Sequence, residues 1–484
     1  MIDSMKKLKS PLSIFALLLL FLFISGNSFS QTSNKNLLAR LDSLLSSDFF
    51  KSSQIAIDIY DLTNKEPVFA KNEKLLLRPA SVEKILTTCT ALNFLGTDFN
   101  FKTKIYHTGE IDDSVCSGDL YVVGGFDPDL TSHDLDSLVR EIKDYGINEI
   151  RGNLYADVSA GDSLIWGNGW MWDDDPGSFA AYLSPLNIDD NSIQVIYEPG
   201  IIGEPANVEL LPQNNFFKIK NNSVTTDTGK TTIKISRDWI NRNNTITLTG
   251  NILKTKLRDT TSVNIFNPTL YFLNLMKESL DSTGIKLEGK LDTLSLNPEA
   301  EEIFTLERNI DTVIVNMDKT SDNLSAEMVL RAIALNNFPK PATAEKGIKL
   351  VDSLITIAGF DAENYKIVDG SGLSFYNLIS AELVTGILKY FYTNEEDLFV
   401  KLYNSFPISG FDGTLANRMN DTRVERRVHA KTGTISGASN LAGYLQTKSG
   451  SLLAFSIFVQ NYPGHATHAR KIQDKICEIL FEEL

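Results

Sequence analysis

The sequence predicts a mixed α/β (α+β) protein in which an antiparallel sheet is flanked by helices and interrupted by a strand-rich insertion. Strand-like and helix-like segments alternate in both terminal parts of the 484-residue chain, whereas residues 101–300 consist mainly of short alternating segments. A chain of this length is too long to fold around a single hydrophobic core, so two or three domains are expected. Hydrophobic residues make up 42% and charged residues 22%, which is ordinary for a soluble globular protein.

The first 30 residues have the pattern of a secretory signal peptide. Lys6, Lys7 and Lys9 precede an apolar run over residues 12–24, and small residues follow as far as Ser30. The run is short for a membrane span, which needs about 20 apolar residues. We therefore expect cleavage near Ser30 and no stable membrane span, while an uncleaved N-terminal anchor is the alternative.

The part of the chain before residue 101 is expected to contribute helices and a pair of strands. Leucines at helical spacing predict a helix over residues 36–47. Alternating residues predict a strand over 54–60 and a returning strand around 68–70. A second helix opens at Ser81 and runs towards Gly96, because glycine after the last turn favours a helix stop.

The insertion is expected to be mostly β-structure with one long helix. This helix covers residues 267–283, because Asn267 and Pro268 suit the N-cap and the first helical position. Short alternating segments bounded by turn residues predict strands over 102–107, 119–123, 153–157, 192–197, 207–211, 231–236 and 245–249.

The last third returns to mixed structure and completes the sheet. The predicted helices cover 325–335, 343–360, 379–392 and 473–484, and the last of them packs on the sheet. The predicted strands cover 427–432, 440–446 and 452–460, and a turn at Lys448–Gly450 joins the last two into a hairpin. The two terminal parts are therefore expected to form one discontinuous domain.

Net charge and cysteine content restrict the classes of partner and cofactor. A formal net charge of −15 would repel nucleic acid and anionic membrane surfaces. Of the three cysteines, Cys89 is expected to be a buried apolar residue of the helix after Ser81, and pairing of Cys116 with Cys477 stays open. The five histidines show no clustered metal-ligand spacing, so we expect no metal or other cofactor.

Three short motifs carry the chemistry: Ser81–Lys84 (S-V-E-K), Ser321–Asn323 (S-D-N) and Lys431–Gly433 (K-T-G). The first motif alone matches many surface serines, but the ordered trio is the constellation of penicillin-interacting serine acyl enzymes. Helical spacing places Ser81 and Lys84 on one face, one turn apart. The lysine amine can therefore take the proton of the serine hydroxyl without a histidine.

Each motif residue has a chemical role to weigh against a structural one. Lys84 acts as a base only when neutral, and burial together with a second cation, Lys431, would lower its pKa. Ser321 would relay a proton to a leaving amine, Asn323 would hold the substrate backbone, and Asp322 would form structural hydrogen bonds. In isolation the same three residues are a good helix cap.

The third motif is suited to binding a carboxylate and a carbonyl oxygen. Gly433 allows a substrate to approach the backbone closely. Lys431 and the hydroxyls of Thr432 and Thr434 would bind a carboxylate. The amides of Thr434 and Ser81 would form an oxyanion hole. A polar edge strand is the structural alternative.

Three other motifs have simpler explanations. Residues 228–231 resemble the end of a phosphate loop, but Val224 stands where its first glycine belongs. His429 lies close to Lys431, but no G-x-S-x-G elbow accompanies it, so a Ser-His-Asp hydrolase is not favoured. Residues 369–372 (D-G-S-G) predict a turn, whose glycines would also suit a tight wall beside the site.

With these residues assembled, the chain resembles the D-alanyl-D-alanine carboxypeptidase/endopeptidase family of low-molecular-mass class C penicillin-binding proteins (peptidase family S13). The interval of 240 residues between Ser81 and Ser321 is much longer than in class A β-lactamases and simpler D-alanyl carboxypeptidases. The resemblance extends over nearly all of the mature chain and includes residues 120–128, 369–374, 407–415 and 429–434.

The resemblance implies a serine β-lactamase/D,D-peptidase-like transpeptidase domain with two nested strand-rich inserted domains. The implied catalytic domain comprises residues 31–100 and 303–484. The first inserted domain comprises residues 101–195 and 263–302, and the second, nested within it, comprises residues 196–262. The implied catalytic residues are Ser81, Lys84, Ser321, Asn323 and Lys431. The implied substrate-binding residues are Thr432, Gly433, Thr434, Asp174 and Phe179. Some members carry an arginine after the Gly-Leu-Ser stretch, whereas this chain has Phe375, which argues against recognition of a diaminopimelate carboxylate by that route.

These features predict a periplasmic serine D,D-peptidase that acts on peptidoglycan stem peptides through an acyl-enzyme on Ser81. β-Lactam antibiotics should inhibit it covalently, because they mimic the D-Ala-D-Ala terminus. The leaving group would be D-alanine in a carboxypeptidase reaction or a cross-linked stem in an endopeptidase reaction. Two alternatives stay open: a β-lactamase or esterase on the same machinery, and a non-catalytic peptidoglycan-binding protein with this fold.

Overall fold

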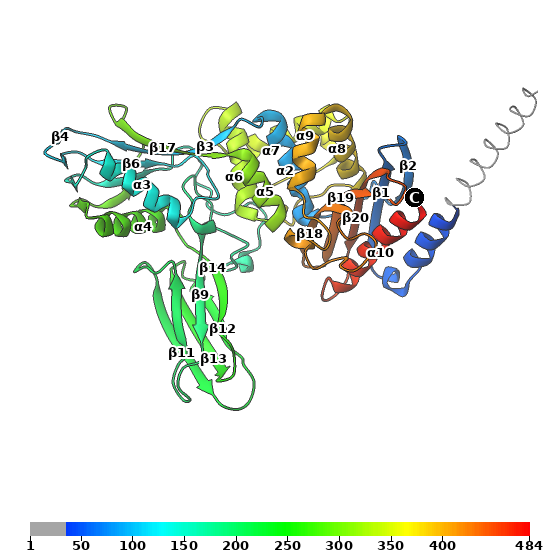
Figure 1. Cartoon of the computed structure of the whole chain (residues 1–484), viewed down its shortest axis with the longest axis horizontal. Helices are drawn as coiled ribbons and strands as arrows, with labels where there is room; N and C mark the ends of the chain where they lie inside the picture. Colours follow the sequence, from blue (N-terminus) through cyan, green and yellow to red (C-terminus); the bar gives the residue numbers. More distant parts are fainter. Residues whose placement is uncertain (1–34) are drawn as a thin grey trace, which may run out of the picture.

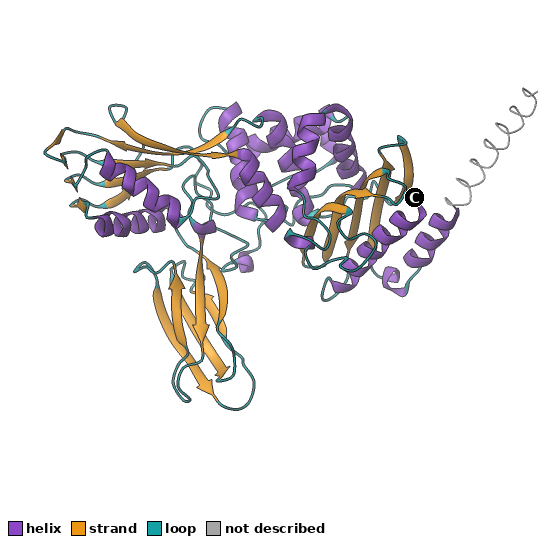
Figure 2. Cartoon of the chain, viewed as in Figure 1, coloured by secondary structure: helices purple, strands orange, loops and turns teal. Residues whose placement is uncertain are grey.

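Strands from both ends of the chain form the central antiparallel sheet, in the order β18-β19-β20-β1-β2 (Figures 1 and 2). The strands are β1 (Gln54–Asp61), β2 (Glu66–Lys71), β18 (Val428–Ile435), β19 (Ala438–Gln446) and β20 (Leu452–Gln460). β1 pairs with β20 along its whole length, from Gln54 opposite Gln460 to Asp61 opposite Leu453. The predicted antiparallel sheet and its C-terminal hairpin are therefore confirmed.

This computed structural model describes residues 35–484, so the predicted signal peptide lies outside the described residues. Helices cover both faces of the central sheet because its strands alternate (Figure 2). Ile55, Ile57 and Ile59 pack with the helix over 35–45 and with α10 (Thr467–Glu483). Ala56 faces the opposite, larger helical core. Over residues 35–484, no helix is long and apolar enough to cross a membrane.

The larger core is built from six helices that lie, in sequence, between the two halves of the sheet. They are α2 (Lys84–Phe94), α5 (Ile310–Thr320), α6 (Asn323–Asn337), α7 (Ala344–Ile357), α8 (Ala381–Asn394) and α9 (Glu396–Ser405). Ser81 itself lies just before α2, in a 3-10 turn over Ala80–Glu83, and not in the α-helix as predicted. The turn keeps Ser81 three residues from Lys84, one helical turn away.

The insertion contains a second five-stranded sheet, in the order β16-β8-β6-β3-β17. Its strands are β3 (Asn100–His107), β6 (Leu120–Val123), β8 (Leu154–Asp157), β16 (Leu291–Thr293) and β17 (Glu301–Asn309). A small sheet joins β4 (Ile111–Asp112), β5 (Val115–Cys116), β7 (Glu149–Ile150) and β15 (Lys286–Leu287). The helices α3 (Ser132–Asp144) and α4 (Pro268–Thr283) pack together against this part.

A pair of three-stranded sheets extends away from the body of the molecule, in green in Figure 1. The sheets contain β9 (Ser192–Glu198), β10 (Asn207–Leu211) and β14 (Asp259–Asn264), and β11 (Lys218–Thr226), β12 (Lys234–Arg237) and β13 (Thr245–Leu253). All four predicted divisions within the described residues fall inside strands: 100/101 in β3, 195/196 in β9, 262/263 in β14 and 302/303 in β17. Each division therefore needs to move to a strand end, because a paired strand is not divided between domains.

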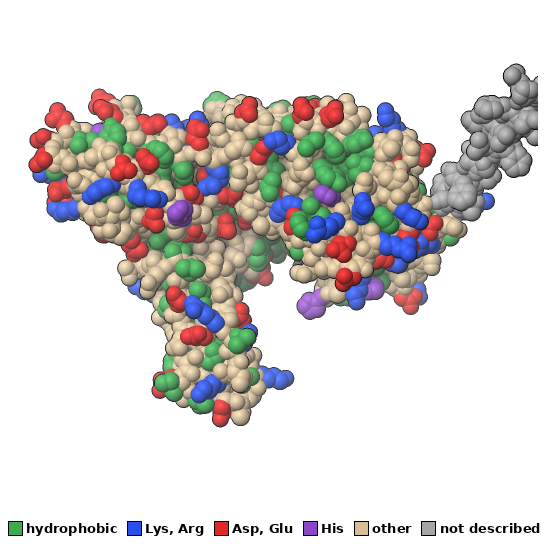
Figure 3. All heavy atoms as spheres, in the orientation of Figure 1, with side chains coloured by type: hydrophobic (Ala, Val, Ile, Leu, Met, Phe, Trp, Pro, Cys, Tyr) green, Lys and Arg blue, Asp and Glu red, His purple; other side chains and the backbone are tan. Residues whose placement is uncertain are grey.

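The sequence patterns missed α3, α5 and α9, although α3 begins with a recognisable capping box. The Thr131 side chain accepts from the Asp134 amide, and the Asp134 side chain accepts from the Thr131 amide. The three cysteines are free and buried, so Cys116 and Cys477 do not pair. On the face seen in Figure 3, acidic and basic side chains are interspersed over the body and the inserted parts.

Candidate active site

The Lys84 amine lies at the centre of the site and is completely buried. Its Nζ is 3.1 Å from Ser81 Oγ, 2.6 Å from Asn323 Oδ1 and 2.7 Å from the carbonyl oxygen of Ser371. An ammonium group has three N–H donors, so these oxygens match its full capacity. The first two motifs are thus joined through one amine, and the 369–374 loop supplies the third acceptor.

The second motif lies at the junction between α5 and α6. Ser321 ends α5 in the left-handed conformation, with φ of 65°, and this turns the chain sharply towards α6. The Asp322 carboxylate accepts from the Ser325 amide and caps α6, which confirms its structural role. The Asn323 amide group donates to the carbonyl oxygen of Phe179 at 2.8 Å. A segment of the insertion therefore reaches the edge of the site.

The third motif reaches Ser321 from the edge strand of the central sheet. Lys431 on β18 is buried, and its Nζ donates to Ser321 Oγ at 2.7 Å. A side chain at Gly433 would place its Cβ 2.7 Å from the carbonyl oxygen of Pro79 and 3.0 Å from the amide nitrogen of Ser81. Only glycine allows β18 to lie this close to the Ser81 turn.

Burial sets the protonation of both lysines. It lowers the pKa of Lys84 to about 8, although nearby carboxylates, Asp322 first among them, act to raise it. Burial also lowers the pKa of Lys431 well below its ordinary value, and the charge of Lys84 lowers it further. We expected the charge of Lys431 to lower the pKa of Lys84, but it is the charge of Lys84 that lowers the pKa of Lys431. Burial raises the pKa of Asp318 to about 6, against the opposing charge of Lys431.

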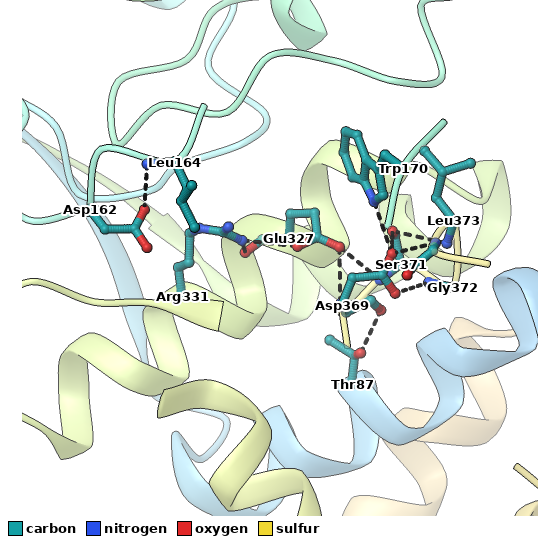
Figure 4. Close-up of polar contacts among 12 residues, drawn as sticks. Thr87, Asp162, Leu164, Trp170, Glu327, Arg331, Asp369, Ser371, Gly372 and Leu373 are labelled. Atoms are coloured by element: carbon teal, nitrogen blue, oxygen red, sulfur yellow. Dashed lines mark hydrogen bonds and ion pairs between the residues drawn. The ribbon is translucent and has the colours of Figure 1, made fainter. Parts of the chain in front are cut away.

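The loop over residues 369–374 forms a fixed wall beside Lys84. Figure 4 shows the hydrogen bonds that hold this loop. The Asp369 carboxylate accepts from Trp170 Nε1 at 2.9 Å and from the amides of Gly372 and Ser374. The Glu327 carboxylate accepts from the amides of residues 370 and 371, each at 3.0 Å. These contacts hold the Ser371 carbonyl against Lys84. The segment over residues 369–372 therefore forms both the predicted turn and a wall of the site.

A hollow of about 650 Å³ opens over the nucleophile. Its lining includes Ser81, Ser321, Asn323, Asp174, Phe179, Phe375 and Thr434. Asp174 has a local role as well, because its carboxylate accepts from the Met171 amide at 2.9 Å. Phe179 is 53% exposed and free to meet a ligand. The Arg78 guanidinium lies 5.1 Å from the centre of the Phe375 ring, which brings a cation close to the position that lacks the family arginine.

Two threonines of β18 have partners that the motifs do not reveal. Thr432 Oγ1 donates to Thr414 Oγ1 at 2.8 Å, and the guanidinium of Arg470 on α10 donates to Thr434 Oγ1 at 3.4 Å. Arg470 lies 36 residues after Thr434, so no local pattern in the sequence connects the two. His429 stacks on Tyr403, with ring centres 4.0 Å apart and planes at 19°, and its role is packing.

Comparison with known proteins agrees with this geometry. The model of the family described as "D-Ala-D-Ala carboxypeptidase 3 (S13) family" matches residues 37–482. The D-alanyl-D-alanine carboxypeptidase of Actinomadura sp. (strain R39) is 30% identical over 464 residues, which cover 91% of this chain and 84% of that protein. The D-alanyl-D-alanine carboxypeptidase DacB of Haemophilus influenzae is 28% identical, over 95% of this chain and 94% of that protein.

Solved structures show the same similarity. The crystal structure of penicillin binding protein 4 (dacB) from Haemophilus influenzae matches with a TM-score of 0.81 and 26% identity, covering 92% of this chain and 98% of that one. The same protein complexed with a β-lactam matches with a TM-score of 0.76 and 25% identity, with the same coverage of both chains. The family model spans the three motifs and both inserted parts. This chain therefore belongs to the D-Ala-D-Ala carboxypeptidase 3 (S13) family.

Proposed function

We propose that this protein is a serine D,D-peptidase that hydrolyses the terminal D-Ala-D-Ala bond, D-Ala cross-links, or both, in peptidoglycan stem peptides. One observation carries the proposal: two serines line one hollow, and each is hydrogen-bonded to a buried lysine. Lys84 Nζ lies 3.1 Å from Ser81 Oγ, and Lys431 Nζ lies 2.7 Å from Ser321 Oγ. The names of the relatives support the same substrate class.

Acylation begins when neutral Lys84 takes the proton of the Ser81 hydroxyl as Oγ bonds to the carbonyl carbon of the penultimate D-Ala. The amides of Ser81 and Thr434 donate to the oxygen that becomes negative. The carbon–nitrogen bond then breaks, and the proton that Lys84 took from Ser81 passes through Ser321 Oγ to the leaving amine, which leaves Lys84 neutral again. Lys431 donates to that hydroxyl and keeps it oriented for the relay.

Deacylation repeats the sequence with water as the nucleophile. Water loses a proton to Lys84 and adds to the ester carbon, the bond to Ser81 Oγ breaks, and the serine regains its proton. The substrate lies along β18, beside Thr432, Gly433 and Thr434. The hydroxyls of the two threonines donate hydrogen bonds to the terminal carboxylate of the substrate. Asp174 and Phe179 contact the stem peptide from the insertion. β-Lactams form the same ester with Ser81 and inhibit the enzyme.

The site of action follows from the substrate, because peptidoglycan lies outside the cytoplasmic membrane. We infer export through the N-terminal segment and activity in the periplasm. The division into one discontinuous catalytic domain and two nested inserts is part of the same proposal, with boundaries moved to strand ends.

Product analysis with purified protein tests the reaction. Monomeric pentapeptide muropeptides and cross-linked dimers are incubated separately, and products are identified by mass spectrometry. The proposal expects D-alanine from the first substrate, monomers from the second, or both. Ser81→Ala should abolish product formation, whereas Ser353→Ala should not. Ser353 is a matched control, since its hydroxyl donates to the Lys349 carbonyl on α7, away from the motifs. Binding of muropeptides without products, or rapid penicillin turnover alone, would contradict the proposal.

A further inference from the structure

A second hollow, of about 350 Å³, lies beside the catalytic one and is lined by aromatic rings. Its lining includes Trp166, Trp172, Asp175, Tyr182, Trp239 and Arg242. Trp172 is 70% exposed, which is unusual for a side chain that gains so much from burial. Exposed apolar surface collected in a concave site indicates a ligand.

The rings of this hollow come from two parts of the chain. Trp172 belongs to the 3-10 turn Trp172–Asp174, and Trp239 belongs to the turn that follows β12. Their ring centres lie 4.8 Å apart, with planes inclined at 39°. Trp166 and Tyr182 form a second pair, with centres 5.0 Å apart and planes at 51°. The two pairs of inclined rings present flat apolar surfaces to the hollow, and the indole N–H and phenol O–H groups lie at the edges of these rings.

Polar contacts fix both parts, so the hollow is preformed. The Asp175 carboxylate accepts from Tyr182 Oη at 2.8 Å and from the fully buried guanidinium of Arg237. The Asp238 carboxylate accepts from the side-chain amides of Asn241 and Asn243 and so organises the turn that presents Trp239. A preformed site spends little free energy on ordering when a ligand binds.

The hollow shares a wall with the catalytic site. Trp172 lines the aromatic hollow, whereas its neighbours Asp173 and Asp174 line the hollow over Ser81. A ligand that occupies both hollows has to pass around this single turn. The peptide portion of the proposed substrate lies over Ser81, so the aromatic hollow takes a part of the same polymer beyond the peptide.

We propose that the aromatic hollow binds a pyranose ring of the glycan strand, an N-acetylated amino sugar. The axial C–H groups of such a ring carry partial positive charge and pack on the negative faces of the indoles of Trp172 and Trp239. The Arg242 guanidinium at the edge donates to the hydroxyl and acetamido oxygens. A volume of about 350 Å³ lies at the lower end of small-molecule sites and suits a single ring rather than a folded protein segment.

This assignment rests on the proposed function for its substrate, but its binding test does not need catalysis. The probe is a peptide-free tetramer of β-1,4-linked N-acetylglucosamine, and binding is followed by saturation-transfer NMR and titration calorimetry on the Ser81→Ala protein. We expect Trp172→Ala to weaken binding about three- to ten-fold, the range that one stacked ring supplies. Trp172→Phe should retain part of the affinity, and Tyr145→Ala, which removes another exposed aromatic ring, should retain all of it.

A kinetic comparison on the protein with intact Ser81 separates sugar binding from catalysis. Trp172→Ala should raise KM for disaccharide-linked stem peptides and leave both the free stem peptide and penicillin acylation unchanged. Absence of oligosaccharide binding, or equal binding by Trp172→Ala, would overturn the proposal. Equal losses on linked and free peptides would also overturn it, because Trp172 would then act through the catalytic turn. If oligosaccharide binds but no peptide is cleaved, the proposed reaction fails while the sugar site stands.

Discussion

At the residue scale, the Lys84 amine governs reactivity because it is both buried and next to the serine. Its pKa of about 8 means that roughly a tenth of the amines are neutral at pH 7. A neutral amine accepts the Ser81 proton, whereas an ammonium does not. Burial therefore makes part of the base available at neutral pH, whereas the nearby carboxylates, which act to raise the pKa of Lys84, limit the neutral fraction.

Acylation should therefore accelerate as the pH rises. Below a pKa of about 8, the neutral fraction of Lys84 increases about tenfold per pH unit, and it levels off above that pKa. We expect the second-order rate constant for penicillin acylation to follow this curve between about pH 6 and pH 9.5. Stopped-flow measurements with a chromogenic β-lactam give the profile. A rate that is flat or falls across this range would show that Lys84 is not the titrating base.

Gly433 offers a second test at this scale. Its missing side chain lets β18 approach the Ser81 turn, and an added Cβ would lie 2.7 Å from a backbone oxygen. Gly433→Ala should slow acylation about ten- to a hundred-fold, because the strand has to move away from the nucleophile. Thermal unfolding of the same variant checks the fold. Unchanged acylation would contradict the close packing of strand and turn.

At the scale of elements, the 369–374 loop connects the insertion to the catalytic helices. Trp170 from the insertion donates to Asp369 (Figure 4). Asp369 organises the loop whose carbonyl at Ser371 accepts from Lys84. The loop is held by side chains on both sides, by Asp369 within it and by Glu327 on α6. A substitution in the insertion can therefore change the hydrogen bonding of Lys84 without contacting this lysine directly.

Trp170→Phe tests this connection. The substitution keeps an aromatic ring but removes the hydrogen bond to the buried Asp369 carboxylate, which should destabilise the fold by about 1–3 kcal/mol. We also expect slower acylation, because the Ser371 carbonyl is less firmly held against Lys84. Denaturant unfolding and penicillin labelling measure the two effects. A loss of stability with no change in acylation would confine Trp170 to a structural role.

At the scale of the whole molecule, buried polar contacts fix the inserted parts to one another. Arg237 at the end of β12 pairs with Asp175 of the neighbouring segment, and both side chains are almost fully buried. Arg237 also donates to the Asn264 carbonyl on β14. The nested sheets are therefore attached through a cation that has no access to water.

Removing one partner of this pair should be strongly destabilising. Arg237→Met leaves the buried Asp175 carboxylate without its cation, with only the Tyr182 hydroxyl as a donor, which costs about 3–5 kcal/mol. Adding Asp175→Asn to that variant should restore part of the stability, since the uncompensated charge is gone. Denaturant unfolding of the single and double variants measures the coupling. Equal stabilities of the two variants would contradict the proposed charge effect.

Sequence patterns predicted what depends on neighbouring residues and missed what depends on distant ones. The alternation in β1 and the spacing of Ser81 and Lys84 are local, and both were predicted from the sequence. The Asn323 side chain reaches Lys84 across 239 residues, and Arg470 reaches Thr434 from another element. The periodicity of hydrophobic residues along the sequence does not predict contacts between residues so far apart. The helix α3 is a different case, because its capping box is a local sequence pattern that marks the start of the helix.

The proposed reaction depends on Ser81 as the acylated nucleophile. Intact-protein mass spectrometry after incubation with benzylpenicillin, followed by peptide mapping of the modified site, tests this role directly. We expect one penicilloyl adduct per chain on Ser81, no adduct on Ser81→Ala, and full labelling of the Ser353→Ala control. An unlabelled wild-type protein, or equal labelling of Ser81→Ala, would contradict it.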